Sequence, residues 1–442
     1  MHPLDWSRAG TGVNRNEDSG WLSSVVGCGD VSTQRLTTLD GGRELIGGNR
    51  ELSRAPGDAG LAGFVGPALS RERHPYLMRR RDFLALASIG VPLGSALPFS
   101  PVAAAGLDKG NVIGLLAREQ DKVDEGAALL KGFVVRLNWD AAQPAEGGAI
   151  SKAACDQLTG AVAFAREHGY SRLKLRLVAG QSAPGWAKAI GGTALDWDND
   201  GKTLTVPRWW TGAYLDAYRG FVLRLRDHLD DPMWCEVTVS ATCTVFAEPC
   251  IHELDSQANR TTLLKLGYTT QDEMDALKRA IAIHEELLSP YGISSSVAYN
   301  PLQTIVVSPD GTTNSLVNDT GKTIELMDHQ RAAMGDFGVW ENNSLIAADI
   351  DGTLEQTRPA YRTMYAHMRA GAAAGHPVQF QTATLAKIQE AKGSVYHTAL
   401  WAARNGGISV ELPVGWEGDG LHGPVIDAAL ADKLNKTFAE NA

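Results

Sequence analysis

Two glutamates, each followed by a proline within two residues, are the first candidates for chemistry in this sequence. Glu248 stands in "FAEPC" after a strand-like run, and Glu411 stands in "VELPV" within one. An unpartnered carboxylate in an apolar strand is costly, so Glu411 requires a partner or a function. A protonated and an ionised carboxyl group on either side of a glycosidic bond can cleave it. We take Glu248 and Glu411 as the predicted catalytic pair; for Glu248 the alternative is a loop acid near a helix start.

Amides and tryptophans gather near the ends of the same predicted strands. Amide groups hydrogen-bond vicinal hydroxyls, and an indole face can stack on the apolar face of a pyranose ring. These residues therefore predict a saccharide-binding site, with core packing as the alternative for each tryptophan. The predicted substrate-binding residues are Asn138, Trp139, Trp186, Asn300, Gln303, Gln381 and Trp416.

Short apolar runs alternate with helix-like segments over residues 106–442. Strands that alternate with helices imply parallel βαβ units, and eight such units predict a (β/α)8 barrel of the TIM type for this domain. A doubly wound open sheet is the competing fold, but the run "NVIGLLAREQ" carries no glycine-rich phosphate loop. The predicted strands cover residues 111–117, 132–139, 171–180, 234–241, 294–301, 343–350, 377–383 and 407–413.

The N-terminal part of the chain predicts export. Residues 1–77 sustain no apolar pattern and are expected to be a disordered or mispredicted extension. Residues 78–105 then combine a basic cluster, an apolar run and a small-residue end at Ala103–Ala105, as an export signal does. Arg80 and Arg81 begin a sequence that resembles the R-R-x-F-L core of twin-arginine signals. This resemblance implies the Tat export machinery as a partner and a periplasmic or extracellular location. The apolar run is broken by glycine and proline, so no stable membrane anchor is expected after cleavage.

Charge and cysteine usage narrow the partners further. The formal net charge of −10 argues against a nucleic-acid partner, which favours a basic surface. No C-x-x-C spacing is present, so a zinc site is not expected, and the sequence predicts neither a metal nor a cofactor. Cys243 and Cys250 bracket one short segment and are candidates for a disulfide after export, with free buried thiols as the alternative.

Three stretches resemble clan-A glycoside hydrolases, which are (β/α)8 barrels: "VVRLNWDAAQP", "LRLVAGQSAPGW" and "FAEP". The resemblance implies that Glu248, after strand four, is the acid/base of a retaining mechanism and that Glu411 is the nucleophile. The sequence departs from the clan at two points. Ala247 stands where the clan has asparagine, and Glu411 lies on predicted strand eight, whereas the clan's nucleophile ends strand seven. A barrel that binds a saccharide without cleaving it is therefore the alternative.

A second resemblance lies in "DIDGT", which begins at Asp349. It is similar to the first motif of haloacid-dehalogenase-type phosphatases, in which the first aspartate attacks a phosphoryl group. For this chain the resemblance implies Asp349 as nucleophile and Asp351 as its acid/base, as a further alternative function. The phosphatase hypothesis needs this strand to open a domain of its own, and little chain follows it. Helix capping by these aspartates is the competing interpretation.

Overall fold

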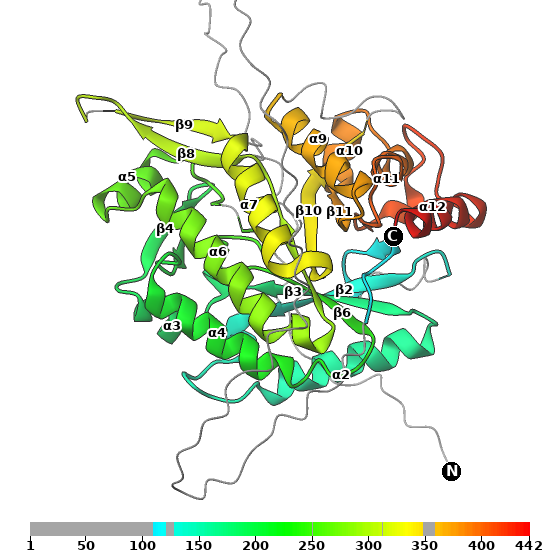
Figure 1. Cartoon of the computed structure of the whole chain (residues 1–442), viewed down its shortest axis with the longest axis horizontal. Coiled ribbons are helices and arrows are strands. Elements are labelled where there is room, and N and C mark those ends of the chain that lie inside the picture. Colours follow the sequence, from blue (N-terminus) through cyan, green and yellow to red (C-terminus); the bar gives the residue numbers. More distant parts are fainter. Residues whose placement is uncertain (1–108, 121–127, 250, 312, 348–358) are drawn as a thin grey trace, which may run out of the picture. The chain divides into compact units, whose positions relative to one another are not determined.

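Eight parallel strands close into a barrel in the computed structural model of this protein (Figure 1). The structure describes residues 109–120, 128–249, 251–311, 313–347 and 359–442. Around the barrel the strand order is β1-β12-β11-β10-β7-β6-β3-β2, so strands adjacent in the chain order of the barrel are also neighbours in space. The predicted (β/α)8 fold is confirmed. The barrel strands are β1 (Gly114–Ala117), β2 (Gly132–Asn138), β3 (Arg172–Val178), β6 (Trp234–Thr238), β7 (Ser294–Ala298), β10 (Gly338–Leu345), β11 (Val378–Thr382) and β12 (Ser409–Leu412).

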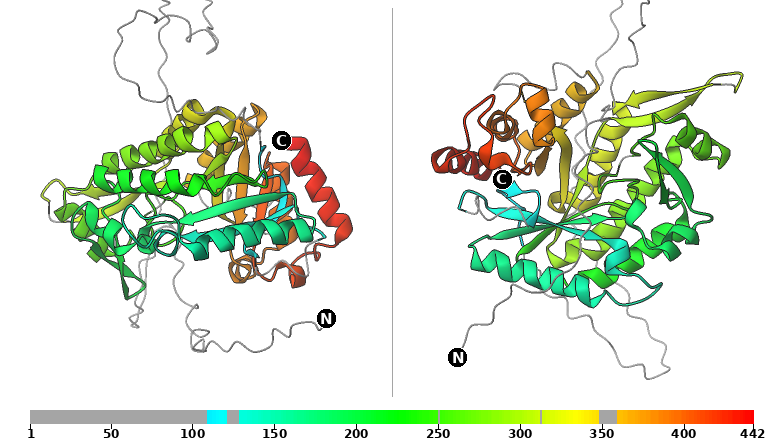
Figure 2. Two further views of the ribbon diagram at one scale, coloured as in Figure 1. Left: turned by 90° about the horizontal axis from the view of Figure 1, so that it is seen from below. Right: turned by 180° about the vertical axis from the view of Figure 1, so that it is seen from behind.

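From β2 onward, each barrel strand is followed by at least one helix, and the helices surround the barrel (Figure 2). Several of them begin at a side chain that accepts a hydrogen bond from the first turn, as the Ser151 and Thr269 caps show. The helices are α1 (Trp139–Ala142), α2 (Lys152–Glu167), α3 (Gly185–Ile190), α4 (Gly212–Arg226), α5 (Gln257–Lys265), α6 (Thr270–Leu287), α7 (Thr320–Met334), α9 (Pro359–Ala373), α10 (Leu385–Glu390), α11 (Val395–Arg404) and α12 (Ala428–Asn441).

Two antiparallel hairpins extend the loops outside the barrel. The first pairs β4 (Leu195–Asn199) with β5 (Lys202–Val206), and the second pairs β8 (Leu302–Val307) with β9 (Asn314–Asp319). Both hairpins lie in loops that follow the carboxyl ends of barrel strands, β3 and β7 respectively. They therefore belong to the side of the barrel on which TIM-barrel enzymes in general carry their active sites.

The two faces of the barrel strands have different chemistry. In β3, Leu173, Leu175 and Leu177 join the hydrophobic core, whereas Lys174 and Arg176 alternate with them. Because successive side chains of a strand point to opposite faces, these two cations point into the barrel. The hydrophobic core thus lies between the strands and the helices, while the barrel interior is largely polar.

The sixth strand differs from its prediction. It runs from Gly338 to Leu345 rather than over residues 343–350, because Val339 and Trp340 are already part of the buried ladder with β7 and β11. Asp349 and Asp351 lie outside the described residues. The strand that leads to them, β10, lies between β7 and β11 in one closed barrel. It does not open a separate domain, and the haloacid-dehalogenase-type phosphatase hypothesis is therefore wrong about the fold.

The export prediction concerns residues that the structure does not describe. The expected extension at 1–77 and the expected signal at 78–105 both precede residue 109, where the description begins. Within the described part of the chain, no helix has both the length and the apolar character needed to cross a bilayer.

The contact between Gly371 of α9 and the indole of Trp340 gives a test of this packing. A Cβ atom added at Gly371 would overlap the Trp340 ring, and it would lie 3.0 Å from both Cε3 and Cη2. Trp340 is fully buried and donates its indole N–H to the carbonyl of Met327. We expect Gly371→Ala to lower the free energy of unfolding by about 1–3 kcal/mol, measured by urea denaturation, because the ring has no free space to move into.

The matched control is a second helical glycine. Gly160 lies on the exposed face of α2, and a Cβ atom there meets nothing within 4 Å. Gly160→Ala should leave stability unchanged or raise it by about 0.5–1 kcal/mol, because alanine is the better helix former. Equal effects of the two substitutions would contradict the packing of α9 against β10 described above.

Candidate active site at the barrel mouth

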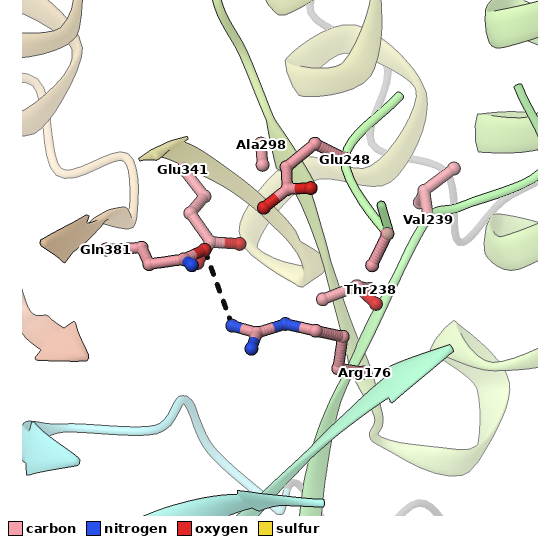
Figure 3. Close-up of a pocket in the computed structure, with 8 residues that line it drawn as sticks. Arg176, Thr238, Val239, Glu248, Ala298, Glu341 and Gln381 are labelled. Atoms are coloured by element: carbon pink, nitrogen blue, oxygen red, sulfur yellow. Dashed lines mark hydrogen bonds between the residues drawn. The ribbon is translucent and has the colours of Figure 1, made fainter. Parts of the chain in front are cut away.

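A small pocket opens among the carboxyl ends of the barrel strands (Figure 3). About 210 Å³ between its walls is free of protein atoms, and this space includes open solvent at the mouth of the pocket. Its walls come from β3, β6, β7, β10, β11 and the loop after β6, which is the region where barrel enzymes carry their catalytic groups. The lining residues are Arg176, Thr238, Val239, Ala247, Glu248, Ala298, Glu341 and Gln381.

A buried lysine lies next to this pocket in the barrel interior. The Nζ atom of Lys174 is 2.7 Å from Oε1 of Glu341 and 3.0 Å from an Oε1 atom of both Glu236 and Glu411. None of the four side chains is more than 2% exposed. The three carboxyl groups come from β6, β10 and β12, so a single ammonium group joins strands from opposite parts of the barrel. We call these four residues the lysine hub.

The guanidinium group of Arg176 and the amide group of Gln379 complete the contacts of the hub. Arg176 forms an ion pair with Oε2 of Glu411 and lies 3.4 Å from Oε1 of Gln381. Gln379 donates to Oε2 of Glu236 at 2.5 Å and lies 3.3 Å from Lys174 Nζ, from which it accepts. Glu236 and Glu411 thus each accept a hydrogen bond from one side chain and, in addition, form an ion pair with Lys174. Among the described residues, the carboxyl group of Glu341 has Lys174 alone as a donor.

These contacts separate the carboxyl groups of the hub electrostatically. Burial raises the pKa of Glu341 to about 7, and the neighbouring Glu411 and Glu236 add to the rise, although Lys174 opposes it. Burial would also raise the pKa of Glu411, but Arg176, Lys174 and Arg118 together lower it to about 2. Burial disfavours the charge on Lys174 too, but the three glutamates raise its pKa above the usual value, so it stays charged. Near neutral pH the site therefore holds one carboxyl group that can carry a proton and one that is ionised.

The structure brings Glu248 to the pocket and places Glu411 in the lysine hub. Glu248 is half-buried in the loop after β6, and its carboxyl group faces the same space as that of Glu341 (Figure 3). Glu411 does not line the pocket, because Lys174 and Arg176 hold its two oxygens. Glu341 was missed by the sequence analysis, since the predicted sixth strand began two residues after it. The apolar pair Val339-Trp340 in the sequence could have indicated the earlier start of this strand and thereby Glu341.

The predicted sugar-stacking tryptophans occupy different environments. Trp139 is fully buried in α1, where its ring stacks on Phe221 with 5.1 Å between centroids. Trp186 is half-buried on α3 and packs edge-on against Trp139. Trp416, in a 3-10 turn (Trp416–Gly418), is 2% exposed. Trp139 and Trp416 belong to the hydrophobic core, so a sugar ring would reach either one only after its neighbours had moved.

Of the predicted substrate-binding amides, Gln381 alone lines the pocket as far as the structure describes the chain. Asn138 ends β2 and accepts a hydrogen bond from Arg136 at 3.1 Å. Asn300 follows β7, donates to Asn343 at 2.6 Å and accepts from Tyr361 at 3.1 Å. Gln303 lies in the β8–β9 hairpin rather than on a barrel strand. Binding roles for Asn138, Asn300 and Gln303 stay predictions.

The cysteine and metal findings concern the described residues only. Cys243 is a free thiol there, fully buried, and burial raises its pKa. Its candidate disulfide partner, Cys250, lies outside the described residues. Within the described ranges, no group of three or more histidine, cysteine or acidic side chains is arranged to hold a metal ion.

Comparison of the chain with protein-family models gives no match, and neither does comparison with curated proteins. Similar solved structures include glycoside hydrolases. An endo-β-1,4-glucanase from Xanthomonas axonopodis pv. citri has a TM-score of 0.40 and 13% identity over 76% of this chain and 96% of that one. The exo-β-1,4-mannosidase Op5Man5 from Opitutaceae bacterium strain TAV5 has a TM-score of 0.39 and 11% identity, over 75% and 60% of the two chains. A D-allulose 3-epimerase from Methylomonas sp. reaches 0.35 at 11% identity, over 75% and 99%. Likenesses this weak carry no argument about activity, and the fold assignment rests on the strand order of the barrel.

The ion pairs of Glu411 predict a specific loss of stability in acid. In the folded chain this carboxyl group binds a proton less tightly than in the unfolded chain, where its pKa is near 4.5. The stability that it contributes is therefore complete above pH 4.5 and is lost as the pH falls toward 2. We expect Glu411→Gln to be less stable than the wild type at pH 7 by roughly 3 kcal/mol, with a difference that shrinks below pH 4.5. Urea denaturation over a pH series measures this.

The control for that series is an exposed ion pair of the same chemistry. Glu286 pairs with Arg219 on the surface, and the pair is about half exposed. Solvent and salt screen such a pair, so Glu286→Gln should change the pH dependence of stability far less. A pH-independent difference between wild type and Glu411→Gln would show that the buried ion pairs do not hold Glu411 ionised.

Proposed function

We propose that this barrel cleaves glycosidic bonds in a carbohydrate substrate, with Glu341 as the general acid and Glu248 as its partner carboxylate. The observation that carries the proposal is that two carboxyl groups with different surroundings face one pocket at the barrel mouth. Glu341 is buried and holds its proton to about pH 7, which suits a group that must protonate a leaving oxygen. Glu248 is half-buried and reaches the pocket from a loop.

The remaining pocket walls support a polyhydroxylated substrate. Arg176, Thr238 and Gln381 place guanidinium, hydroxyl and amide groups around the two carboxyl groups. Such side chains donate to and accept from vicinal hydroxyls of a sugar. Val239, Ala247 and Ala298 supply apolar surface between them, as expected for a site that binds the C–H faces of a ring.

This proposed pair replaces Glu411 of the sequence prediction with Glu341. A nucleophile must reach the anomeric carbon, but the structure gives both oxygens of Glu411 a cationic partner inside the barrel. Glu341 lies on the sixth strand and lines the pocket. The proposal keeps the two-carboxylate mechanism and changes which second carboxyl group takes part.

A saccharide-binding protein without turnover is the second candidate. It is favoured by the seventh strand, β11, which ends in Gln381 and Thr382 and carries no acid at the position expected from the clan-A resemblance. Ala247 in place of asparagine before Glu248 favours it as well. In this version the same pocket binds the sugar, but no bond is cleaved.

The activity test uses the chain from residue 106 with a panel of chromogenic glycosides and oligosaccharides. We expect hydrolysis of at least one substrate, and a loss of kcat/KM by a factor of about 10² or more in both Glu248→Gln and Glu341→Gln, because each removes a proton-transfer or charge-stabilising group. Circular dichroism checks that both variants fold. Binding of a saccharide by calorimetry without any turnover would establish the second candidate instead.

Glu253 provides the matched control for these variants. Burial raises its pKa to about 7, as for Glu341, but it lies outside the pocket. Glu253→Gln should retain wild-type activity within about threefold, as expected for a position that does not contact the substrate. A loss as large as that of Glu341→Gln would mean that the pocket has been assigned to the wrong carboxyl groups.

We also propose that the protein is exported through the twin-arginine pathway. The support is the sequence of residues 78–105, with Arg80 and Arg81 before an apolar run and a small-residue end. An extracellular or periplasmic location suits an enzyme that acts on polymeric or environmental sugars.

Fractionation of a bacterial host tests the export proposal. Arg80→Lys with Arg81→Lys should leave an uncleaved precursor in the cytoplasm, because the receptor of this pathway reads the arginine pair rather than its charge. The wild-type chain should give a shorter product outside the cytoplasm, with an N-terminus near residue 106 by mass spectrometry. Normal export of the double variant would overturn the twin-arginine assignment.

A further inference from the structure

The lysine hub has one negative charge more than its cations can match. Lys174 and Arg176 supply two positive charges, and Glu236, Glu341 and Glu411 supply three negative charges when all are ionised. A buried cluster with an excess charge is costly in the low-dielectric interior of a protein. The cluster becomes neutral when it retains one proton, so the barrel interior holds a proton that an exposed set of the same groups would release.

The hydrogen-bond donors and ion-pair partners of the three carboxyl groups together indicate which one keeps this proton. Gln379 donates to Glu236, and Arg176 donates to Glu411, in addition to the contacts of both with Lys174. A carboxyl group that has one hydrogen-bond donor and a cation as a second neighbour is stabilised in its ionised form more than a carboxyl group with a single partner. Glu341 accepts from Lys174 through Oε1, and no other donor to its carboxyl group is present among the described residues. The proton therefore belongs on Glu341, whose carboxyl group faces the pocket.

We propose that Lys174 and Glu236 are positioning residues that set, with opposite effects, the pH at which Glu341 releases the proton of the hub, and so the pH range in which the pocket can deliver it. This inference rests on the proposed function, because it assigns the regulation of the same site. Neither residue lines the pocket. They have opposite effects on the pKa of Glu341: Lys174 lowers it and favours the ionised form, whereas Glu236 raises it and favours the protonated form.

The other charged groups around Glu341 are unchanged in the variants that test the roles of Lys174 and Glu236. Arg176 and Glu411 lie on β3 and β12, and both interact with Glu341. Arg118 follows β1, interacts with Glu411 and Glu248, and donates to the carbonyl of Thr382. Glu248 reaches the region from the loop after β6 and interacts with Arg176. Arg118 and Glu248 carry opposite charges, so the excess charge of the hub remains that of its three glutamates.

The test compares Glu236→Gln with Lys174→Met. Glu236→Gln removes one negative charge, so Glu341 should lose its proton at lower pH; Lys174→Met removes one positive charge, so Glu341 should keep it to higher pH. We expect the two shifts to be at least about one pH unit each and opposite in direction. If Lys174→Met does not fold, Lys174→Gln removes the same charge and keeps an amide donor.

Two readouts separate this inference from the proposed function. The first is the carboxylic-acid infrared band of protein labelled with ¹³C-glutamate, titrated with pH and assigned to Glu341 by its disappearance in Glu341→Gln. The second is the basic limb of the pH dependence of kcat/KM on the best glycoside. The inference is supported when the infrared titration shifts in opposite directions in the two variants, whether or not the chain hydrolyses a glycoside.

Two results would overturn the inference. One is a Glu341 titration that stays the same in both variants, because the hub would then hold the fold together without controlling the proton. The other is a shift in the same direction in both, which general loosening of the barrel would cause. Opposite infrared shifts without turnover of any glycoside would refute the proposed activity and leave the hub inference standing.

Discussion

The ion pairs of Lys174 are the interaction on which the rest of the site depends. A barrel of this size is usually filled by branched apolar side chains, whereas here an ammonium group contacts carboxyl groups from three other strands. Loss of Lys174 would leave buried carboxylates without their shared cation, which costs several kcal/mol. We therefore expect the Lys174 position to tolerate little substitution, and its ion pairs link β3 to β6, β10 and β12 across the barrel.

This polar interior also determines the electrostatics of the small pocket. Groups removed from water interact more strongly with one another, and their protonation depends on a few close neighbours rather than on the solvent. Glu341 is both buried and accessible from the pocket, since its side chain is 2% exposed and yet lines the pocket. The same residue thus connects the charge balance of the barrel with the surface that a substrate would touch.

The sequence was sufficient for the fold but only partly for the site. Alternating runs such as "RLKLRLV" and "GISVELP" predicted the strands, because period-two burial is a local property. The same alternation did not reveal that Lys174 and Arg176 face a closed interior, since a half-exposed strand has the same pattern. Glu248 was found from its position after strand four. Glu341 was missed because the predicted sixth strand began at residue 343, although the apolar pair Val339-Trp340 indicates the earlier start that pairing with β7 and β11 gives it.

The last helix gives the barrel a particular folding order. Asn435 of α12 accepts a hydrogen bond from the backbone N–H of Leu115 in β1, a residue 320 positions earlier, and donates to the carbonyl of Leu129. β1 also needs β12 as its neighbour to close the barrel. A chain still emerging from the ribosome lacks these partners until β12 and α12 have been made, so one side of β1 remains an unpaired edge until then. Such edges are sites of aggregation, and contacts this distant in sequence form slowly. The newly made protein therefore exposes this edge to aggregation until α12 docks.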